Sequence, residues 1–288
     1  MPFYTDMETM LREVKPDILH ICLPHMLHVP AAKLAAKYGV HVFMEKPPAL
    51  HVRQLHELDG LEQSAGIKIG VCLQNRYNNT TKELQRRLAS GETGKIQGCK
   101  AILTWNRPKE YYTKDPWRGL WEQAGGGVML SQAIHTLDLM TLFCGPARAV
   151  QGFTANLVHA DIQVEDTAVA QIEFEGNVRG LFYGSVGYSS DAAVELELDC
   201  EKAVYRISDG RLWQTSPAGQ ILLAQDVLEH GGKSYYGNGH LEAIQRFYRS
   251  VEQDERDYIT LEDAAACMAL IDGVNQSAAE GKKVRAAT

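Results

Sequence analysis

The sequence has no excess of basic residues. It carries 29 lysines and arginines against 36 aspartates and glutamates, which gives the 288-residue chain a formal net charge of −7. The cations are scattered along the chain, so no basic face is available to neutralise a phosphate backbone. We therefore expect no nucleic-acid partner.

The sequence also lacks the cysteine pairs that mark many metal sites. Its six cysteines are widely spaced and form no CxxC pair. Three of them fall within apolar strand or helix patterns, which is typical of reduced thiols in a core. We predict no metal site. The cysteines are Cys22, Cys72, Cys99, Cys144, Cys200 and Cys267.

Long apolar runs are absent as well. No stretch approaches the roughly 20 residues of a membrane span. The first residues, Met1 to Asp6, lack the basic and apolar regions of a signal peptide. We expect a cytoplasmic protein without a membrane partner. With 45% hydrophobic residues, the chain is globular and long enough for two domains.

Strand and helix patterns alternate in the first part of the chain. Apolar runs at residues 18–23, 40–44 and 67–71 are separated by helical patterns at 29–38 and 50–66. This order predicts parallel strands with right-handed crossovers, as in a doubly wound Rossmann sheet.

The pattern changes class after about residue 95. Most strand segments there follow one another without an intervening helix, which predicts a largely antiparallel sheet. We predict an α/β domain over residues 1–77 and an α+β domain with a large, mostly antiparallel open sheet over residues 78–288. The expected helices of the second domain lie near 127–143, 241–252 and 261–280. Its expected strands are 96–105, 150–158, 168–174, 178–186, 194–198 and 203–207.

One lysine stands where a strand of the first domain ends. Lys46 lies between Glu45 and two prolines, Pro47 and Pro48, directly after the apolar run 40–44. In an open α/β sheet, ligands bind beyond the carboxyl ends of the strands, so a cation fixed there is a candidate proton donor or acceptor. A surface salt bridge at a strand-to-loop corner would explain the same pattern.

A second cluster opens a helix of the second domain. The glycines of Gly125–Gly127 allow the backbone to approach a ligand closely. Ser131, His135 and Asp138 follow at spacings that place them on one helix face. The alternative for His135 is a satisfied histidine on an apolar helix, and we expect Asp138 to orient it or to cap a loop.

Seven short motifs are spread over nearly the whole chain. They are Ile21-Cys22-Leu23-Pro24 with His28, Glu45-Lys46-Pro47, Gln74-Asn75-Arg76-Tyr77, Trp117-Arg118-Gly119, Gly125-Gly126-Gly127 through His135 and Asp138, Val164-Glu165-Asp166, and Tyr236-Gly237-Asn238-Gly239-His240. In this order they resemble the Gfo/Idh/MocA oxidoreductases. The resemblance implies a Rossmann domain, a sheet-containing substrate domain and an NAD or NADP cofactor. It also implies hydride transfer at a carbinol carbon of a sugar, sugar derivative or cyclitol.

The resemblance assigns roles to individual residues. Lys46 and His135 match the catalytic pair that moves the proton of the reacting hydroxyl and binds its oxygen. Ser131 stands where well-studied members carry an aspartate, and a hydroxyl cannot act as a carboxylate. The implied cofactor-binding residues are Pro24, His25, His28, Glu45, Lys46, Pro47, Gln74 and Arg76. The implied substrate-binding residues are Trp117, Arg118, Ser131, His135, Tyr236 and His240.

Further groups have both a structural and a functional interpretation. Tyr111 and Tyr112, like Tyr235 and Tyr236, either stack on a sugar ring or cover core. We expect the pair Glu165-Asp166 to anchor a turn or helix rather than to react.

One expected feature is absent from the sequence. The family's Rossmann domain begins with a strand, a GxGxxG turn, a helix and a strand that reads the ribose, a unit of at least roughly 30 residues. No such unit precedes the strand at 18–23. We expect an incomplete Rossmann domain, from a start codon assigned too far downstream or from a shortened chain that binds cofactor poorly. The first explanation is favoured because an unpaired parallel edge costs stability.

Two functions therefore stay open on the sequence. An NAD(P)-dependent sugar or cyclitol dehydrogenase is favoured by Lys46 and His135, whereas a non-catalytic ligand-binding or regulatory relative is favoured by Ser131 and the absent glycine turn. The open sheet predicts a homo-oligomer that pairs through the second domain.

Overall fold

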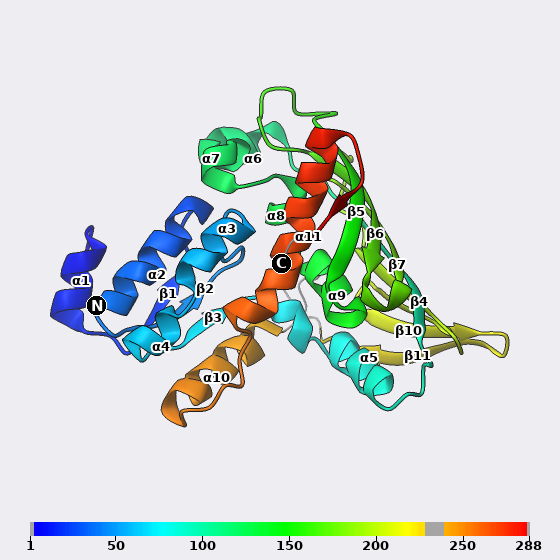
Figure 1. Ribbon diagram of the computed structural model, residues 1–288, viewed down its shortest axis with the longest axis horizontal. Helices are drawn as coiled ribbons and strands as arrows, with labels where there is room; N and C mark the ends of the chain where they lie inside the picture. The colour runs from blue at the N-terminus through cyan, green and yellow to red at the C-terminus, as the bar shows by residue number, and fades with distance from the viewer. Residues whose placement is uncertain (1–2, 228–238, 287–288) are drawn as a thin grey trace.

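The computed structural model describes residues 3–227 and 239–286, which form two sheets and the helices that pack on them (Figure 1). The first sheet has three parallel strands in the order β1-β2-β3. The order of elements is the alternation that the sequence predicts. These elements are α1 (Met7–Val14), β1 (Ile18–Ile21), η1 (His25–Leu27), α2 (His28–Lys37), β2 (His41–Met44), α3 (Val52–Leu55), η2 (His56–Leu58), α4 (Leu61–Ala65) and β3 (Ile69–Val71).

The segment between β2 and β3 differs from the single helix expected over 50–66. It contains α3, η2 and α4, and Gly60 precedes α4 with a φ of 71°. This left-handed conformation is open to glycine without strain and interrupts the helical hydrogen bonds. The helical spacing of the leucines continues across Gly60, so the sequence pattern gave no sign of this break.

The second sheet has nine strands in the order β11-β10-β9-β8-β4-β7-β6-β5-β12. Only β4 and β7 pair in parallel, so the prediction of a large, mostly antiparallel open sheet is confirmed. The hairpin β10-β11 and the short β12 were not expected. The strands are β4 (Ile96–Thr104), β5 (Ala147–Ala155), β6 (Thr167–Phe174), β7 (Arg179–Ser185), β8 (Glu195–Cys200), β9 (Val204–Ser208), β10 (Arg211–Ser216), β11 (Gly219–Gln225) and β12 (Val284–Arg285).

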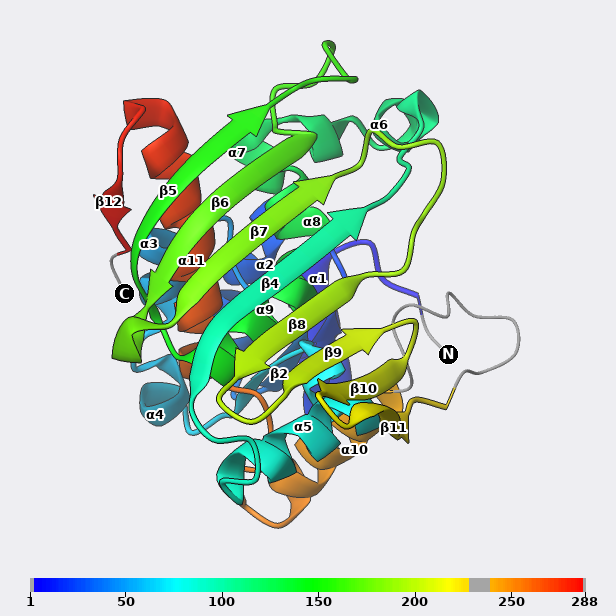
Figure 2. The same cartoon turned by 90° about the vertical axis from the view of Figure 1, so that its right-hand side faces the viewer.

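Helices cover one face of the large sheet, and α11 lies between that sheet and the first domain (Figure 1). Figure 2 shows the other face, which no helix of the described residues crosses. The helix expected over 127–143 is two helices, α8 and α9, separated by Gln132 and Ala133. The remaining helical elements are η3 (Gln74–Tyr77), α5 (Asn79–Ala89), α6 (Lys109–Lys114), η4 (Pro116–Gly119), α7 (Trp121–Ala124), α8 (Val128–Ser131), α9 (Ile134–Cys144), η5 (Glu175–Asn177), α10 (Gly239–Glu252) and α11 (Leu261–Glu280).

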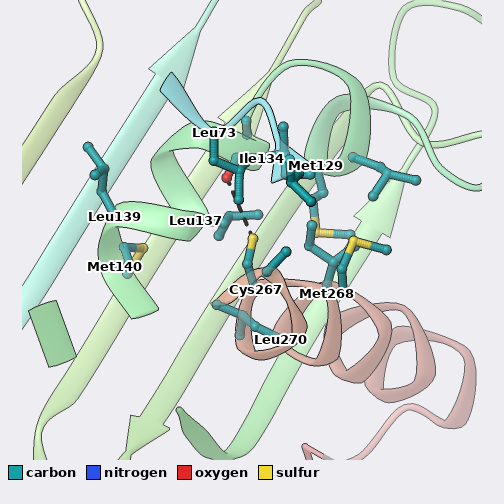
Figure 3. Packing of buried hydrophobic residues seen from close by; sticks show 14 of the residues in the cluster. Leu73, Met129, Ile134, Leu137, Leu139, Met140, Cys267, Met268 and Leu270 are labelled. Carbon is teal, nitrogen blue, oxygen red and sulfur yellow. Dashed lines mark hydrogen bonds between the residues drawn. The ribbon is translucent and has the colours of Figure 1, made fainter. Parts of the chain in front are cut away.

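The helices α9 and α11 share a core that fixes the position of the α9 N-terminus (Figure 3). Leu137, Met140 and Leu270 are completely buried there. The Cys267 thiol donates a hydrogen bond to the Ile134 carbonyl oxygen at 3.5 Å. Because close-packed interiors resist displacement, the side chains on the first turn of α9 are held in place. All six cysteines are free thiols; five are buried as expected of core thiols, whereas Cys22 is exposed.

Within the described ranges, no single helix is long and apolar enough to cross a membrane. The bent pair Trp121–Gln132 and Ile134–Cys144 reaches that length and composition only when its two parts are counted together. The second part is almost entirely buried in the protein core.

Candidate active site

The carboxyl ends of the three parallel strands lie side by side, and His28 ties two of the loops that leave them. Its Nδ1 lies 2.7 Å from the Pro47 carbonyl oxygen, and its Nε2 lies 2.7 Å from the Leu23 carbonyl oxygen. The side chain is completely buried. Because both ring nitrogens are engaged by the backbone, His28 shapes the crevice and does not face a ligand, which differs from the direct contact expected from the sequence.

His25 joins the first domain to the second. Its Nδ1 lies 2.8 Å from the Ala124 carbonyl oxygen, and its ring packs edge-on against Trp117 with 4.8 Å between ring centres. Burial lowers the pKa of His25 to about 3, so the ring is neutral near pH 7. A neutral ring that donates to Ala124 keeps Nε2 as an acceptor.

Lys46 reaches from the end of β2 to helix α8. Its Nζ donates a hydrogen bond to the Ser131 backbone carbonyl at 2.7 Å. Burial of the amine lowers the pKa of Lys46, and the Glu45 carboxylate opposes this shift. The amine therefore combines a fixed position with a depressed pKa, as a proton-transfer group working near neutral pH requires.

His135 lies on the first turn of α9 and is buried. Its Nε2 lies 3.5 Å from the Gln74 side-chain nitrogen. Burial, followed by the charge of Lys46 and by His240, lowers the pKa of His135 well below its usual value. The ring is thus neutral near pH 7 and able to hydrogen-bond a substrate hydroxyl. The structure brings Lys46, Ser131 and His135 together, as the sequence suggested.

Arg76 and Asp138 have partners that the sequence did not reveal. The Arg76 guanidinium donates to Asp138 from Nε at 2.9 Å and from Nη2 at 2.7 Å, and it also donates to the Asp263 carbonyl oxygen at 2.8 Å. Arg76 was expected to bind the cofactor and Asp138 to orient His135. The two form an ion pair inside the protein because η3 packs against α9.

A buried glutamate supports the glycine run. Glu165 accepts hydrogen bonds from the backbone N–H groups of Gly127 at 2.8 Å and Met129 at 3.1 Å. A side chain at Gly127 would place its Cβ 1.8 Å from the Glu165 carbonyl oxygen, which explains the glycine. The expectation that Glu165 anchors a helix agrees with these contacts, and the helix it anchors is α8, which carries Ser131.

Glu165 should make stability depend on pH. Burial raises its pKa from 4.5 to about 7, although the backbone N–H groups oppose the shift. Because the folded chain holds this proton more tightly than the unfolded chain, the free energy of unfolding falls as the pH rises from 4.5 to 7. The loss amounts to about 3 kcal/mol and is complete above that window. Unfolding by urea at several pH values measures it.

The matched variants are Glu165→Gln and the exposed Glu122→Gln. Glu165→Gln has no titrating proton, so its stability should lack this part of the pH slope, whereas Glu122→Gln should keep the wild-type slope. An identical slope in wild type and Glu165→Gln would show that the carboxyl group does not titrate there.

Three possible ligand atoms lie close together beside Lys46. Atoms of Glu45, Cys72 and His240 all lie within 4.8 Å of one another. The sequence did not suggest this cluster, because its members are distant in the chain and follow no metal-binding spacing. Burial and the Glu45 charge raise the pKa of the Cys72 thiol far above its usual value. In the proposal below, Glu45 and His240 serve as polar groups of the site.

An aromatic and cationic wall closes the site on the side of the second domain. The Arg118 guanidinium carbon lies 4.4 Å from the Tyr111 ring centre and 5.0 Å from that of Trp117. Arg118 also donates to the Tyr111 hydroxyl oxygen at 2.7 Å and to Asp115 at 3.2 Å. Trp117 and Arg118 thus lie together beside His25. Tyr236, also expected at the substrate, falls outside the described residues.

The strand ends offer both apolar and hydrogen-bonding groups to a nicotinamide. Leu23 and Leu27 expose apolar side chains at the end of β1, and the partly exposed Glu45 carboxylate can accept hydrogen bonds from hydroxyl groups. The sequence contains no GxGxxG, and the described part of the first domain has no glycine-rich turn between a strand and a helix. We therefore place no residue at the pyrophosphate.

Parallel strands, a crevice at their carboxyl ends and a fixed lysine beside a neutral histidine define a dehydrogenase with a nicotinamide-binding Rossmann domain. Comparison with known families agrees. Residues 1–72 match the model of an oxidoreductase family with an NAD-binding Rossmann fold, and residues 81–206 match the GFO/IDH/MocA C-terminal domain. The chain belongs to the Gfo/Idh/MocA family and is an NAD(P)-dependent dehydrogenase.

Individual relatives cover most of the chain at low identity. The D-glucoside 3-dehydrogenase of Escherichia coli (strain K12) is 23% identical, and the match spans 98% of this chain and 82% of that protein. The myo-inositol 2-dehydrogenase of Thermotoga maritima is 21% identical over 98% of this chain and 83% of that protein. The structure of the WlbA dehydrogenase from Bordetella pertussis, in complex with NADH and UDP-GlcNAcA, superposes with a TM-score of 0.87 at 25% identity, covering 99% of this chain and 84% of that one.

Proposed function

We propose that this dehydrogenase transfers a hydride between NAD(P) and a carbinol carbon of a sugar, sugar derivative or cyclitol. The observation that carries the proposal is the Lys46 amine, which has a depressed pKa, is held 2.7 Å from the Ser131 carbonyl oxygen and lies beside the neutral His135. The similarity to glucoside and inositol dehydrogenases supports a polyhydroxylated substrate.

The proton steps follow from the side chains of this chain. A bound nicotinamide supplies the hydride acceptor or donor. During oxidation, the neutral Lys46 amine takes the hydroxyl proton as the substrate oxygen becomes a carbonyl oxygen, and during reduction the Lys46 ammonium returns that proton. His135 donates a hydrogen bond to the same oxygen and stabilises the negative charge that develops on it.

Ser131 then has a role that needs no carboxylate. Its backbone carbonyl, and not its hydroxyl, accepts the hydrogen bond from Lys46. The contact fixes one N–H direction of the amine and leaves the others for the substrate oxygen. The aspartate that other family members carry at this position is therefore not required for holding the lysine.

We assign the cofactor's nicotinamide end to the loops after β1, β2 and β3, and the substrate to the side of α8, α9 and η4. His28 and Arg76 support the site indirectly. His28 contacts the carbonyl oxygens of Leu23 and Pro47, and Arg76 forms the ion pair with Asp138. The proposed cofactor-side residues are Pro24, His25, Glu45, Lys46, Pro47 and Gln74, and the proposed substrate-side residues are Trp117, Arg118, Ser131, His135 and His240.

The test is a panel of sugars, sugar acids and inositols incubated with NAD⁺ or NADP⁺ while the absorbance of the reduced nicotinamide is followed. We expect turnover of at least one polyol. Titration of NADH and NADPH, followed by nicotinamide fluorescence, measures cofactor binding separately. Saturable binding of both NADH and a polyol without any turnover would sink the proposal in favour of a non-catalytic relative.

We also propose that the chain forms a homo-oligomer through the open face of the large sheet (Figure 2). Cross-strand neighbours form an apolar row on that face: Phe153 pairs with Val169, Val169 with Tyr183, and Tyr183 with Ile102. Leu181, two residues from Tyr183 on β7, is 49% exposed. A row of this kind on a monomer would be an aggregation hazard, so a second copy is the simplest cover.

Leu181→Asp is expected to dissociate the oligomer, because burying the new carboxylate without a partner costs more than the contact returns. Light scattering on a sizing column measures the mass of each variant. Val14→Asp, which places the same charge at an exposed apolar position of α1, should leave the mass unchanged. A wild-type chain that is monomeric at micromolar concentration would reject the interface.

A further inference from the structure

We propose that Arg118, Tyr111 and Gln132 form a subsite for a carboxylate group of the substrate, so that the enzyme prefers sugar acids to neutral sugars. The inference rests on the proposed function, since it names the substrate class of the same site.

The subsite adjoins the proton-transfer group. Gln132 directly follows Ser131, whose carbonyl accepts the hydrogen bond from Lys46 at 2.7 Å. The Gln132 Nε2 lies 3.1 Å from the Tyr111 hydroxyl oxygen, and the Arg118 Nη1 lies 2.7 Å from that same oxygen. One hydroxyl thus joins an amide from the α8–α9 junction to a guanidinium from η4, next to the place where the substrate would react.

The amide of Gln132 is buried, and only its nitrogen has a hydrogen-bond partner. The residue is 6% exposed, and its Oε1 has no hydrogen-bond partner within the described residues. In this orientation the Tyr111 hydroxyl accepts from both neighbours and keeps its own proton to donate. If the amide is turned over, Tyr111 donates to Oε1 and the amide nitrogen is left over. In the first orientation the buried Oε1 is an acceptor without a donor, whereas the turned amide satisfies it and leaves both of its N–H groups unused. The turned orientation is therefore the one that a carboxylate would select.

Arg118 adds an unused, positively charged donor. Asp115 engages its Nε and Tyr111 its Nη1, whereas Nη2 makes no hydrogen bond in the described part of the chain. The neighbouring Arg107 pairs with Asp191, since its Nη1 lies 3.2 and 3.3 Å from the two carboxylate oxygens. An unused guanidinium nitrogen beside a neutral donor suits the negative charge of a carboxylate.

Binding to paired probes tests the subsite. The probes are D-glucuronate against D-glucose, and UDP-glucuronate against UDP-glucose, each titrated calorimetrically into the full chain with and without NADH. The first pair isolates the carboxylate, and the second shows whether a diphosphate is the anion that binds. We expect each acid to bind at least about tenfold more tightly than its neutral counterpart, as a charge-assisted hydrogen bond predicts.

The variants separate charge from geometry. Arg118→Met should lower the affinity for each acid much more than the affinity for its neutral counterpart, so that the preference for the acid is lost, and Arg118→Lys should recover part of the preference. Gln132→Leu should weaken binding of the acids several-fold. Arg148→Met is the control, because Arg148 also pairs with one carboxylate, Glu173 at 3.3 Å, but lies on β5. It should behave as wild type.

Three results would overturn the subsite. These are equal affinity for acid and neutral sugar, no detectable binding of either acid at millimolar concentration, and a loss on Arg118→Met that is the same for UDP-glucose as for UDP-glucuronate. The proposed function is judged separately by turnover. Oxidation of neutral sugars without any acid preference would leave it intact, whereas tight binding of acids without turnover of any polyol would support the subsite and reject the function.

Discussion

Replacing Lys46 with methionine is expected to lower kcat about a thousandfold, a much larger effect than any loss of cofactor affinity. Methionine has a similar length but no amine, so the hydrogen bond to the Ser131 carbonyl oxygen and the proton-transfer group are lost together. Steady-state kinetics on the best substrate of the panel measures kcat, and nicotinamide fluorescence measures cofactor binding. The control is Lys33→Met, which removes a surface lysine that pairs with Glu57 at 2.6 Å.

The pH profile provides a second readout for Lys46. Because the amine must be unprotonated to accept the hydroxyl proton, oxidation by the wild type should accelerate as the pH rises through the lowered pKa of Lys46. The residual activity of Lys46→Met should lack that rise. Unchanged activity in this variant would show that another group moves the proton and that the assignment is wrong.

Replacing Arg76 with methionine is expected to lower the free energy of unfolding by about 3–5 kcal/mol. The side chain of Asp138 is 1% exposed, and each of its two oxygens accepts one hydrogen bond from the guanidinium. Burial raises the pKa of Asp138, and the Arg76 charge opposes that shift. Without Arg76, the carboxylate is buried and unpaired, so it should take up a proton and the loss should grow with pH. Urea unfolding at two pH values measures both effects.

A double variant and a surface control distinguish the cost of an unpaired buried charge from the loss of any arginine. Arg76→Met with Asp138→Leu should recover most of the lost stability, because no buried charge remains. Arg246→Met removes a more exposed guanidinium that pairs with both Glu242 and Asp257, and it should cost less than about 1 kcal/mol. A loss in Arg76→Met no larger than in Arg246→Met would mean that the buried pair contributes little to stability.

The parallel strands of the first domain were predictable because their signal is local. A strand buried on both faces needs a nearly continuous apolar run, which β2 supplies, and β1 carries a similar run although its His20 is exposed and only Ile21 is fully buried. The break at Gly60 and the division between α8 and α9 were not predictable, since the apolar spacing continues across both. The β10-β11 hairpin was missed because its strands expose much of their surface and so lack a clean apolar alternation.

The candidate site was predictable in its members but not in its contacts. Lys46 and His135 stand out as polar residues at the end of a strand and at the start of a helix, where the backbone directs side chains into a crevice. Gln132 and Tyr111 gave no such signal, because amides and tyrosines are common in both cores and surfaces.

The sequence by itself determined the class of protein: its alternating elements predict a parallel α/β domain, and its motifs at the ends of those elements resemble one family of dehydrogenases. Only the tertiary structure decided which polar groups form hydrogen bonds with one another. Lys46 meets a carbonyl 85 residues away, and Arg76 meets a carboxylate 62 residues away. The physical reason is that local periodicity fixes which face of an element is buried, whereas the packing of η3, α8 and α9 against the strand ends fixes which polar groups lie within hydrogen-bonding distance.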